Sequence, residues 1–239
     1  QARRAICMNN LRQIFLGLAM YAQDYDDYYV YTTPSGFDSA YLWNNIYYPI
    51  GLLLQGYRAT RKGKYVEKPD IFVCTSYKIT PGAIKPNVKD IKNNFEVPNK
   101  YAGTSYRPDP LVYSYIWWVP VSLQPRGKFS RAARLGLIAV SENLYLNDMW
   151  GLIPHPERQQ RIHPYDGKPR LYPEGINVVF FSGAVKWLPN RVRPTGYRIF
   201  DYDPTNGSLQ NTYKFTTGPR SGTYSVMYFW GQFTEGTTP

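Results

Sequence analysis

The stretch 1–30, QARRAICMNNLRQIFLGLAMYAQDYDDYYV, predicts a long helix, and this helix constrains the fold more than any other segment. Apolar residues recur along it at alternating steps of four and three, a spacing that places them on one side of a helix. This apolar seam consists of Cys7, Leu11, Ile14, Leu18, Tyr21 and Tyr25. The helix from Arg3 to Tyr25 would be about 34 Å long. We expect its seam to pack against the rest of the domain.

The start of this helix lacks the usual N-terminal signals. A helix that began here would carry Ser, Thr, Asp or Asn as a cap and acidic residues in its first turn. Instead, Arg3 and Arg4 occupy positions where the helix dipole disfavours cations. We therefore expect residues upstream of this numbering to continue the helix. The sequence has no uninterrupted apolar run of the ~18 residues that a transmembrane helix requires, so the chain as written is expected to be soluble.

Shorter elements are predicted after the helix. Tyr41 to Gln55 is expected to be a short helix or an irregular apolar packing piece, interrupted at Pro49. A basic loop, 56–70, leads to a short strand at Ile71 to Cys74. Thr80 to Pro110 is a long polar insertion punctuated by proline, which we expect to be ordered only by contact with something else.

The second half of the chain has the alternation and the turn residues of strands. The predicted strands are Val112 to Val119, Leu135 to Val140, a hairpin of Ile176 to Phe181 with Ala184 to Leu188 across Ser182-Gly183, and two or three more strands in Gly196 to Phe233. The expected fold class is α+β, with a long N-terminal helix packed on an antiparallel sheet, long loops and a β-rich C-terminal extension. The expected parts are the helix (1–30), a globular α+β domain (31–194) and the extension (195–239).

The composition is rich in tyrosine, with 23 Tyr, 6 Trp and 11 Phe, whereas charged residues make up only 19%. Tyrosine suits half-buried sheet surfaces and subunit interfaces, since its ring is apolar and its hydroxyl can stay hydrated. The 20 Pro and 19 Gly predict many connections and few helices. This composition favours one long helix followed by sheet and loops.

The N-terminal segment also carries a family pattern. Residues 2–14 read Ala-Arg-Arg-Ala-x-Cys-x-x-Asn-Leu-Arg-Gln-Ile, and an aliphatic helix and Tyr-x-x-Asp-Tyr-Asp follow, ending at Asp26. This segment resembles the one that follows the hydrophobic N-terminal helix in bacterial prepilin-type proteins, the pseudopilin-like family related to type II secretion major pseudopilins. Looser similarities continue to about residue 190 and occur in the order usual for that family.

Three looser matches make up this continuation. Phe72 to Ser76 is similar to the family's Phe-x-Cys-Pro-Ser, with Thr75 in place of the proline. Ser114-Tyr115-Ile116 lies where a Ser-Tyr-x-x-Asn strand is usual, although Trp118 replaces the Asn. His163 and 176–187 resemble the closing pattern of a His and then Asn-Val-Leu-Phe-x-Asp-Gly-His-Val. In that pattern, Ser182 and Ala184 replace the Asp and the His.

The resemblance implies a structural subunit rather than an enzyme. Such a subunit would be exported and would assemble into an extracellular or periplasmic filament of a type II secretion or type IV pilus-like system. It would form a homo-oligomer and would contact the inner membrane only through a missing upstream segment. Its helix would form the shared filament core, and its Tyr-rich sheet and loops would make lateral contacts.

The two cysteines are Cys7, on the predicted helix, and Cys74, on a predicted strand. Two cysteines cannot form a Cys-x-x-Cys redox motif here or a cysteine-rich metal cluster. Two buried thiols are one interpretation. The resemblance implies instead a disulfide that joins helix to sheet, because both residues match family cysteine positions and the implied compartment is oxidising. Closing so long a loop would contribute about 4 kcal/mol.

Catalytic and metal-binding patterns are weak. His155 and His163 are the only histidines, both lie beside proline, and no Gly-x-Ser-x-Gly nucleophile motif occurs. We expect His163 to be a hydrogen-bonded loop residue, although a surface-polymer hydrolase remains a distant alternative. Acidic residues that could suggest calcium are Asp24, Asp26, Asp27, Asp201 and Asp203. They lack the Gly-centred loop and terminal Glu of an EF-hand, and Ser182 stands where related pseudopilins carry a calcium-associated Asp. We expect no cofactor and no metal; a bound calcium is the minority hypothesis, which a shift of the melting temperature with chelator would test.

Charge supports a second hypothesis. Lys and Arg number 28 against 17 Asp and Glu, a net charge of +11, with basic clusters at 58–68, 126–134 and 158–170. Basic runs interleaved with aromatic residues can bind nucleic acid or acidic polysaccharide. Candidate anion-binding residues are Arg61, Lys62, Lys64, Arg126, Lys128, Arg131 and Arg134. The alternatives are a pilin-like binding module for DNA or acidic glycan, and a hydrated surface whose charges pair with those of neighbouring subunits; we favour the second.

The tail after Pro194 is dense in aromatic residues at alternating positions. An exposed extension of this kind would be an aggregation hazard on a free monomer, so we expect a neighbouring subunit to cover it. Residues expected at this assembly interface are Tyr213, Phe215, Tyr224, Tyr228 and Trp230.

Overall fold

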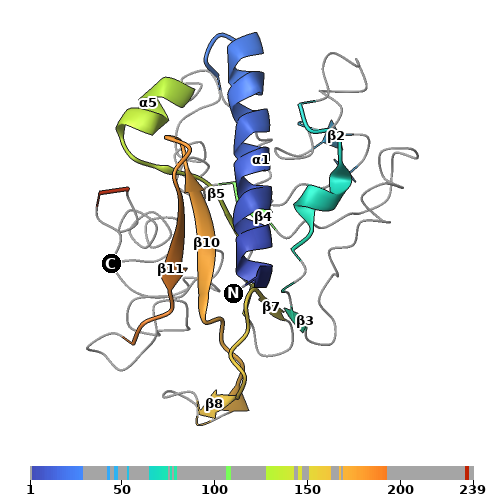
Figure 1. Cartoon of the computed structure of the whole chain (residues 1–239), viewed down its shortest axis with the longest axis vertical. Coiled ribbons are helices and arrows are strands. Elements are labelled where there is room, and N and C mark those ends of the chain that lie inside the picture. Colours follow the sequence, from blue (N-terminus) through green and yellow to red (C-terminus); the bar gives the residue numbers. More distant parts are fainter. Residues whose placement is uncertain are drawn as a thin grey trace.

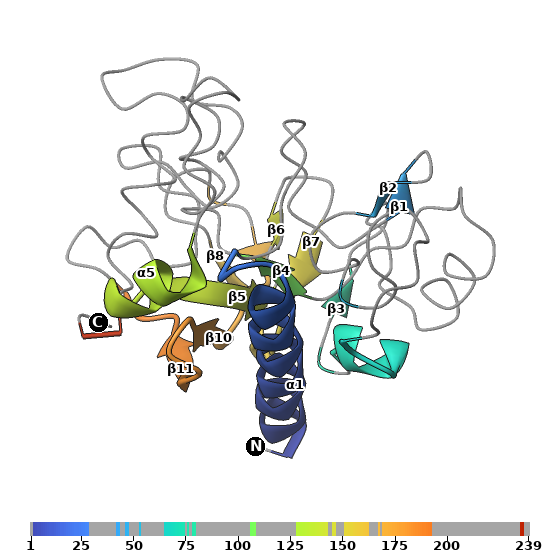
Figure 2. The ribbon, with the colours of Figure 1, turned by 90° about the horizontal axis from the view of Figure 1, so that it is seen from above.

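One long helix, α1 (Ala2–Asp24), packs lengthwise against an antiparallel sheet, and this pairing makes the fold α+β (Figure 1). The computed structural model describes residues 2–28, 42–43, 46–47, 53, 65–74, 76, 78–79, 106–108, 128–142, 145–146, 151–162, 167, 169–192 and 235–236. Among these residues there are two further helical segments, the 3-10 helix η3 (Pro69–Phe72) and the short helix α5 (Phe129–Arg134). Seen from above, α1 has β10 and β11 on one side and η3 on the other (Figure 2).

The sheet that contacts α1 has four strands in the order β11-β10-β5-β4, and all neighbours are antiparallel. Its strands are β4 (Tyr106–Pro108), β5 (Ile138–Glu142), β10 (Gly175–Phe180) and β11 (Val185–Pro189). Every residue of β5 and of β10 is buried. Because side chains alternate between the two faces of a strand, both faces of these central strands are covered.

Smaller sheets surround this core. One has three strands in the order β3-β7-β6, made by β3 (Lys78–Ile79), β7 (Gly151–Ile153) and β6 (Tyr145–Leu146). Two others are two-stranded: β1 (Leu42–Trp43) with β2 (Ile46–Tyr47), and β8 (Arg161–Ile162) with β9 (Pro169–Arg170). The predicted short helix or irregular piece at Tyr41 to Gln55 is therefore wrong for its first part, which pairs as strands.

The seam of α1 lies against the sheet and forms much of the core. Cys7, Leu11 and Ile14 are fully buried, and Leu18 and Tyr21 nearly so. Tyr25 is a correction to the predicted seam, since it is 38% exposed. It lies beyond the last helical residue, where the chain turns through positive φ at Asp26 and Asp27, so the helical spacing no longer aims it at the core.

Gly17 lets a second segment approach the helix. A Cβ atom at this position would lie 2.8 Å from Val66 Cγ2 and 3.4 Å from the Tyr65 carbonyl oxygen. The segment at 65–66 is held there because the N–H groups of Tyr65 and Val66 both donate to the Leu53 carbonyl, at 2.9 and 3.0 Å. The absence of a side chain at Gly17 thus allows backbone to close over the core beside α1.

The predicted hairpin is confirmed. β10 and β11 pair in register from Gly175 with Pro189 to Val179 with Val185, and the turn passes through Gly183 at φ 88°. That left-handed conformation suits glycine because it has no Cβ. The Gly183 N–H donates to the Phe180 carbonyl at 2.8 Å and closes the turn.

Three other predicted elements need correction. Ile71 to Cys74 is not a strand: η3 ends at Phe72, and Pro69, whose fixed φ suits a first turn, starts it. The strand expected at Leu135 starts only at Ile138, because α5 precedes it and the chain reverses at Gly136, φ 64°. Within the insertion at 80–110, β4 pairs with β5 of the same chain, so this part of the insertion has a partner within the domain.

Several predictions fall outside the described residues. They concern the strand at 112–119, the tail strands at 196–233, His163, Asp201 and Asp203. Near the end of the tail, the Glu235 N–H donates to the Gly136 carbonyl at 3.0 Å, and Lys186 Nζ donates to the Glu235 carbonyl at 2.6 Å. This point of the tail contacts the chain's own domain.

Candidate functional site

The first turns of α1 are fastened to the segment after η3 by a disulfide. Cys7 and Cys74 are joined with their Cα atoms 5.6 Å apart and a sequence separation of 67, the pairing that the family resemblance implies. Both residues are buried. Asn10 adds a second link, since its amide donates to the Val73 carbonyl at 3.5 Å, and the Ser76 N–H points to Cys74 Sγ at 3.5 Å.

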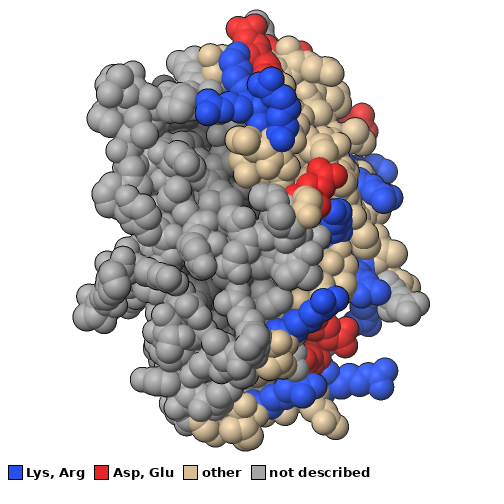
Figure 3. All heavy atoms as spheres, turned by 90° about the vertical axis from the view of Figure 1, so that its left-hand side faces the viewer, with Lys and Arg blue, Asp and Glu red and all other residues tan. Residues whose placement is uncertain are grey.

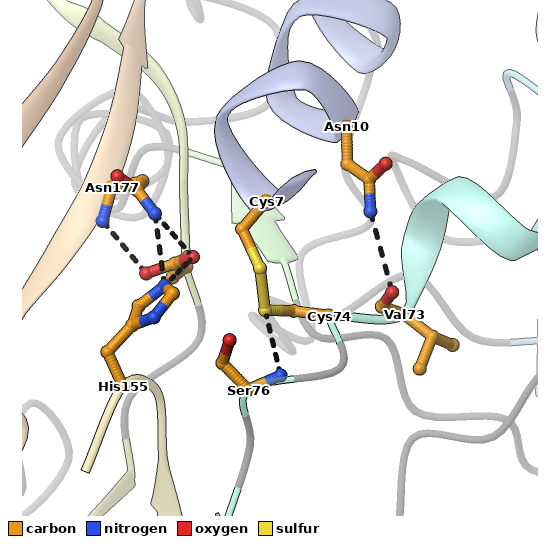
Figure 4. Close-up of a disulfide and its surroundings, with 8 residues drawn as sticks. Cys7, Asn10, Val73, Cys74, Ser76, His155 and Asn177 are labelled. Atoms are coloured by element: carbon orange, nitrogen blue, oxygen red, sulfur yellow. Dashed lines mark hydrogen bonds and ion pairs between the residues drawn. A yellow bond between two sulfur atoms is a disulfide. The ribbon is translucent and has the colours of Figure 1, made fainter. Parts of the chain in front are cut away.

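A cluster of three buried polar residues lies beside this disulfide. Glu142 is the last residue of β5, Asn177 lies in β10, and His155 follows β7. Glu142 and Asn177 have no exposed surface and His155 has 9%. Figure 4 shows His155 and Asn177 on one side of the disulfide and Asn10 and Val73 on the other. We call Glu142, His155 and Asn177 the polar cluster.

The carboxylate of Glu142 is the centre of this cluster. Its Oε2 accepts the backbone N–H of Asn177 at 2.8 Å, and its Oε1 accepts Asn177 Nδ2 at 2.9 Å. His155 Nε2 lies 2.9 Å from the same Oε1 and 3.1 Å from Asn177 Nδ2. Because a buried carboxylate without partners would be strongly destabilising, these contacts explain how the core accommodates Glu142.

His155 is held rigidly by its surroundings. It has a left-handed backbone, φ 45°, and its carbonyl accepts the Glu174 N–H at 2.8 Å. Its ring meets the Trp187 ring edge to face, with centroids 5.3 Å apart, and the Arg4 guanidinium lies 4.6 Å from the centroid of the Trp187 ring. The imidazole is therefore fixed with Nε2 toward Glu142.

The two cysteines, Glu142 and His155 bring four potential metal ligands together. The two Sγ atoms, a Glu142 carboxylate oxygen and a His155 ring nitrogen all lie within 4.8 Å of one another. In the disulfide state the sulfurs are bonded to each other, and the part of the chain that the structure describes contains no free thiol. In that state the arrangement braces the fold, and neither cysteine offers a thiolate.

The opposite end of α1 carries an aromatic cluster. Tyr21 stacks on Tyr25 with ring centroids 4.2 Å apart, and Tyr65 meets Tyr21 edge on at 5.5 Å. The Tyr65 hydroxyl donates to Asp24 Oδ2 at 2.7 Å. Burial, and then the neighbouring Tyr25, raises the pKa of Tyr21 to about 12. Burial, followed by the hydrogen bond to Asp24, also raises the pKa of Tyr65. Both hydroxyls thus stay protonated donors at neutral pH.

The acidic residues after α1 attach α5 rather than forming an open ligand set. Asp27 Oδ1 accepts the Ser130 N–H at 3.0 Å, and its Oδ2 accepts the Ser130 hydroxyl at 2.6 Å. The Asp27 carbonyl accepts the Phe129 N–H at 2.7 Å. Asp27 therefore caps the N-terminus of α5 from a distant part of the chain.

The basic candidates are only partly described. Lys128 donates to the Asp26 carbonyl and lies over the Tyr28 ring at 3.7 Å, so its charge is used within the chain. Arg131 and Arg134 are exposed. Figure 3 shows basic side chains spread from the upper to the lower end of the described part of one face, with acidic side chains among them. The remaining candidates, Arg61, Lys62, Lys64 and Arg126, and the expected interface residues Tyr213, Phe215, Tyr224, Tyr228 and Trp230 lie outside the described residues.

Sequence reasoning did not single out Glu142 or Asn177. A signal was present for each. Glu142 is a charged residue directly after the apolar run LGLIAVS, and Asn177 interrupts the strand GINVVF. Polar residues at buried strand positions are paired, so each could have been matched to the histidine that no motif used.

Comparison of the chain with protein-family models, curated proteins and solved structures gave no match. Among the helices that the structure describes, none has both the length and the apolar character that crossing a membrane requires.

Proposed function

We propose that this chain is a structural pilin-like or pseudopilin-like subunit that assembles into an extracellular or periplasmic filament, of a type II secretion or type IV pilus-like system. The observation that carries this proposal is that α1 has apolar residues on the side that faces away from its sheet. Ile6, Leu16 and Met20 are 49%, 58% and 49% exposed, whereas Leu11, Ile14 and Leu18 cover the sheet.

The exposed residues share one side of the helix. At about 100° per residue, Ile6 and Met20, which are two heptads apart, lie at similar angles, and Leu16 lies one turn before Met20. A surface helix normally presents polar residues to water, and Asn9 and Gln13 on this side are polar and exposed. Three large exposed apolar side chains beside them favour a second packing partner. The partner we propose is α1 of another copy, because equivalent helices offer each other the same apolar spacing.

The disulfide and the packing of the sheet on α1 support the same function. In a filament whose core is made of such helices, each globular domain must stay attached to its helix. Cys7 joins α1 covalently to the segment that carries Cys74, and the sheet packs along the same helix. The domain would therefore move with the helix as one body.

The test is a change to the exposed side of α1. The double variant Leu16→Glu with Met20→Glu should leave the domain folded, since both side chains are exposed, but should abolish filaments in electron micrographs of native material. Leu135→Glu with Val192→Glu is the matched control, because it adds two charges at exposed apolar positions outside α1. Filaments that survive in the double variant would exclude this side of α1 as the core contact.

A second measurement separates the scaffold from the anion-binding hypothesis. A scaffold should elute from heparin at low salt, whereas a binding module should be retained and should lose retention in Arg131→Gln with Arg134→Gln. Strong retention that these changes weaken, in a protein that forms no filament, would favour the binding module.

A further inference from the structure

We propose that the reduced form of this chain binds one Zn²⁺ ion through Cys7, Cys74, His155 and Glu142, so that a disulfide and a metal are alternative occupants of the same buried position. The four side chains come from four different segments: α1, the segment after η3, β5, and the residues after β7. Their ligand atoms lie within 4.8 Å of one another, and all four residues are buried.

The spacing fits a tetrahedral ion after small shifts. Zinc bonds of about 2.3 Å to sulfur and about 2.0 Å to nitrogen or oxygen place neighbouring ligands roughly 3.3 to 3.8 Å apart. His155 Nε2 and Glu142 Oε1 are 2.9 Å apart and would separate slightly to admit the ion. Breaking the sulfur–sulfur bond separates the sulfurs in the required direction, and the 5.6 Å between the Cα atoms leaves room for that separation.

The ligand types select zinc over harder ions. Two thiolates and an imidazole suit zinc, whereas calcium and magnesium prefer sets made of oxygen atoms. With two thiolates and one carboxylate, the site would carry a net charge of −1 around Zn²⁺, which is less costly to bury than three uncompensated anions.

Neighbouring groups are placed to orient these ligands. The Asn177 backbone N–H holds Glu142 Oε2, which leaves Oε1 directed toward His155. The Ser76 N–H points to Cys74 Sγ, and the Trp187 ring fixes the plane of His155. Such outer contacts orient metal ligands and tune their basicity.

A dithiol reductant supplies the two electrons that convert the disulfide state into the zinc-binding state. The reductant transfers two electrons, the Cys7–Cys74 bond breaks to give two thiols, and the reductant closes its own disulfide. Zinc then displaces the two thiol protons, while His155 binds through Nε2 with its remaining proton on Nδ1. A disulfide oxidant reverses the first step and releases the ion. The newly made chain would thus hold this position with zinc until it reaches an oxidising compartment.

The test uses the whole chain and Co²⁺ as a spectroscopic substitute for zinc. The oxidised protein should bind neither ion. After reduction with a dithiol and its removal without oxygen, the protein should take up one ion per chain and show the visible bands of tetrahedral Co²⁺ together with thiolate-to-cobalt bands. His155→Gln and Glu142→Gln should each weaken binding by about tenfold or more.

Matched controls distinguish this site from binding by two thiols alone. Glu157→Gln removes a carboxylate that pairs with Arg161 instead, and His163→Gln removes the other histidine. Both variants should bind Co²⁺ and Zn²⁺ with the affinity of the parent protein. Equal affinity in all four variants would overturn the proposal, as would a reduced parent without thiolate-to-cobalt bands.

Folding supplies a second measurement if the reduced chain loses structure. Zinc should then restore the far-ultraviolet circular dichroism of the oxidised protein, since metal that binds only the folded state drives folding. His155→Gln should need more zinc for the same recovery. A reduced chain that zinc cannot refold would contradict the proposal, because the four ligands would not be brought together.

Discussion

The two ends of α1 are attached to the rest of the molecule in different ways. At the N-terminal end, a disulfide and the polar cluster connect residues that are distant in sequence, and all of these groups are buried. At the C-terminal end, Tyr65 with Asp24 and Ser130 with Asp27 span similar sequence distances, but these hydrogen bonds are exposed. Breaking a buried connection strongly destabilises the fold, whereas an exposed hydrogen bond contributes less because it competes with water. We therefore expect the N-terminal end of α1 to stay attached to the domain and its C-terminal end to separate from the domain more easily.

The largest expected effect is removal of the disulfide. Cys7→Ala with Cys74→Ala should lower the free energy of unfolding by about 4 kcal/mol, because the unfolded chain regains the entropy of an open loop. Urea denaturation of the oxidised parent and of the variant measures this difference. A loss below about 1 kcal/mol would mean that the N-terminal end is held mainly by packing.

The next effect compares the two sides of the helix nearer its C-terminal end. Leu18→Ala should destabilise the domain by about 3 kcal/mol, because Leu18 is 5% exposed and its removal leaves a cavity. Leu16→Ala, two residues away and 58% exposed, is the matched control and should change stability by about 0.5 kcal/mol or less. Equal losses in both variants would show that α1 is buried on both sides in the isolated chain.

A smaller effect is expected where α5 joins α1. Asp27→Ala should lower stability by about 1 kcal/mol, since the N-terminus of α5 loses its cap. Asp27→Asn keeps an oxygen acceptor and should lose less. Thermal unfolding of the two variants measures the difference, and an unchanged midpoint in Asp27→Ala would show that the contact contributes nothing in solution.

The smallest effect is a dependence on alkaline pH at the aromatic cluster. Because the pKa of Tyr21 is raised to about 12 in the folded state, against about 10 unfolded, the neutral hydroxyl favours folding. This contribution is complete below pH 10 and is lost as pH rises from about 10 to about 12. Urea midpoints measured across that range should fall less in Tyr21→Phe than in the parent. If the urea midpoints of Tyr21→Phe and of the parent fall in parallel, the alkaline pH dependence comes from other groups. Tyr65 is the first of these, and Tyr65→Phe would test it.

The sequence predicted best those elements whose signal is local. The α1 seam follows from helical spacing, and the β10–β11 hairpin follows from alternation on both sides of a Gly turn. Prediction failed where a tertiary contact decided the outcome. β4 exists because β5 offers it a partner, and α5 starts where Asp27, a hundred residues earlier, supplies its cap.

The sequence by itself determined the long helix, its buried side and the hairpin, because periodicity acts over a few residues and needs no partner from elsewhere. Only the tertiary structure decided that Glu142, His155 and Asn177 meet beside the Cys7–Cys74 disulfide. Each of these residues is unremarkable in its own segment, and no spacing along the chain links them. Their proximity arises because α1, β5 and β10 share one core, where buried polar groups must find one another in place of water.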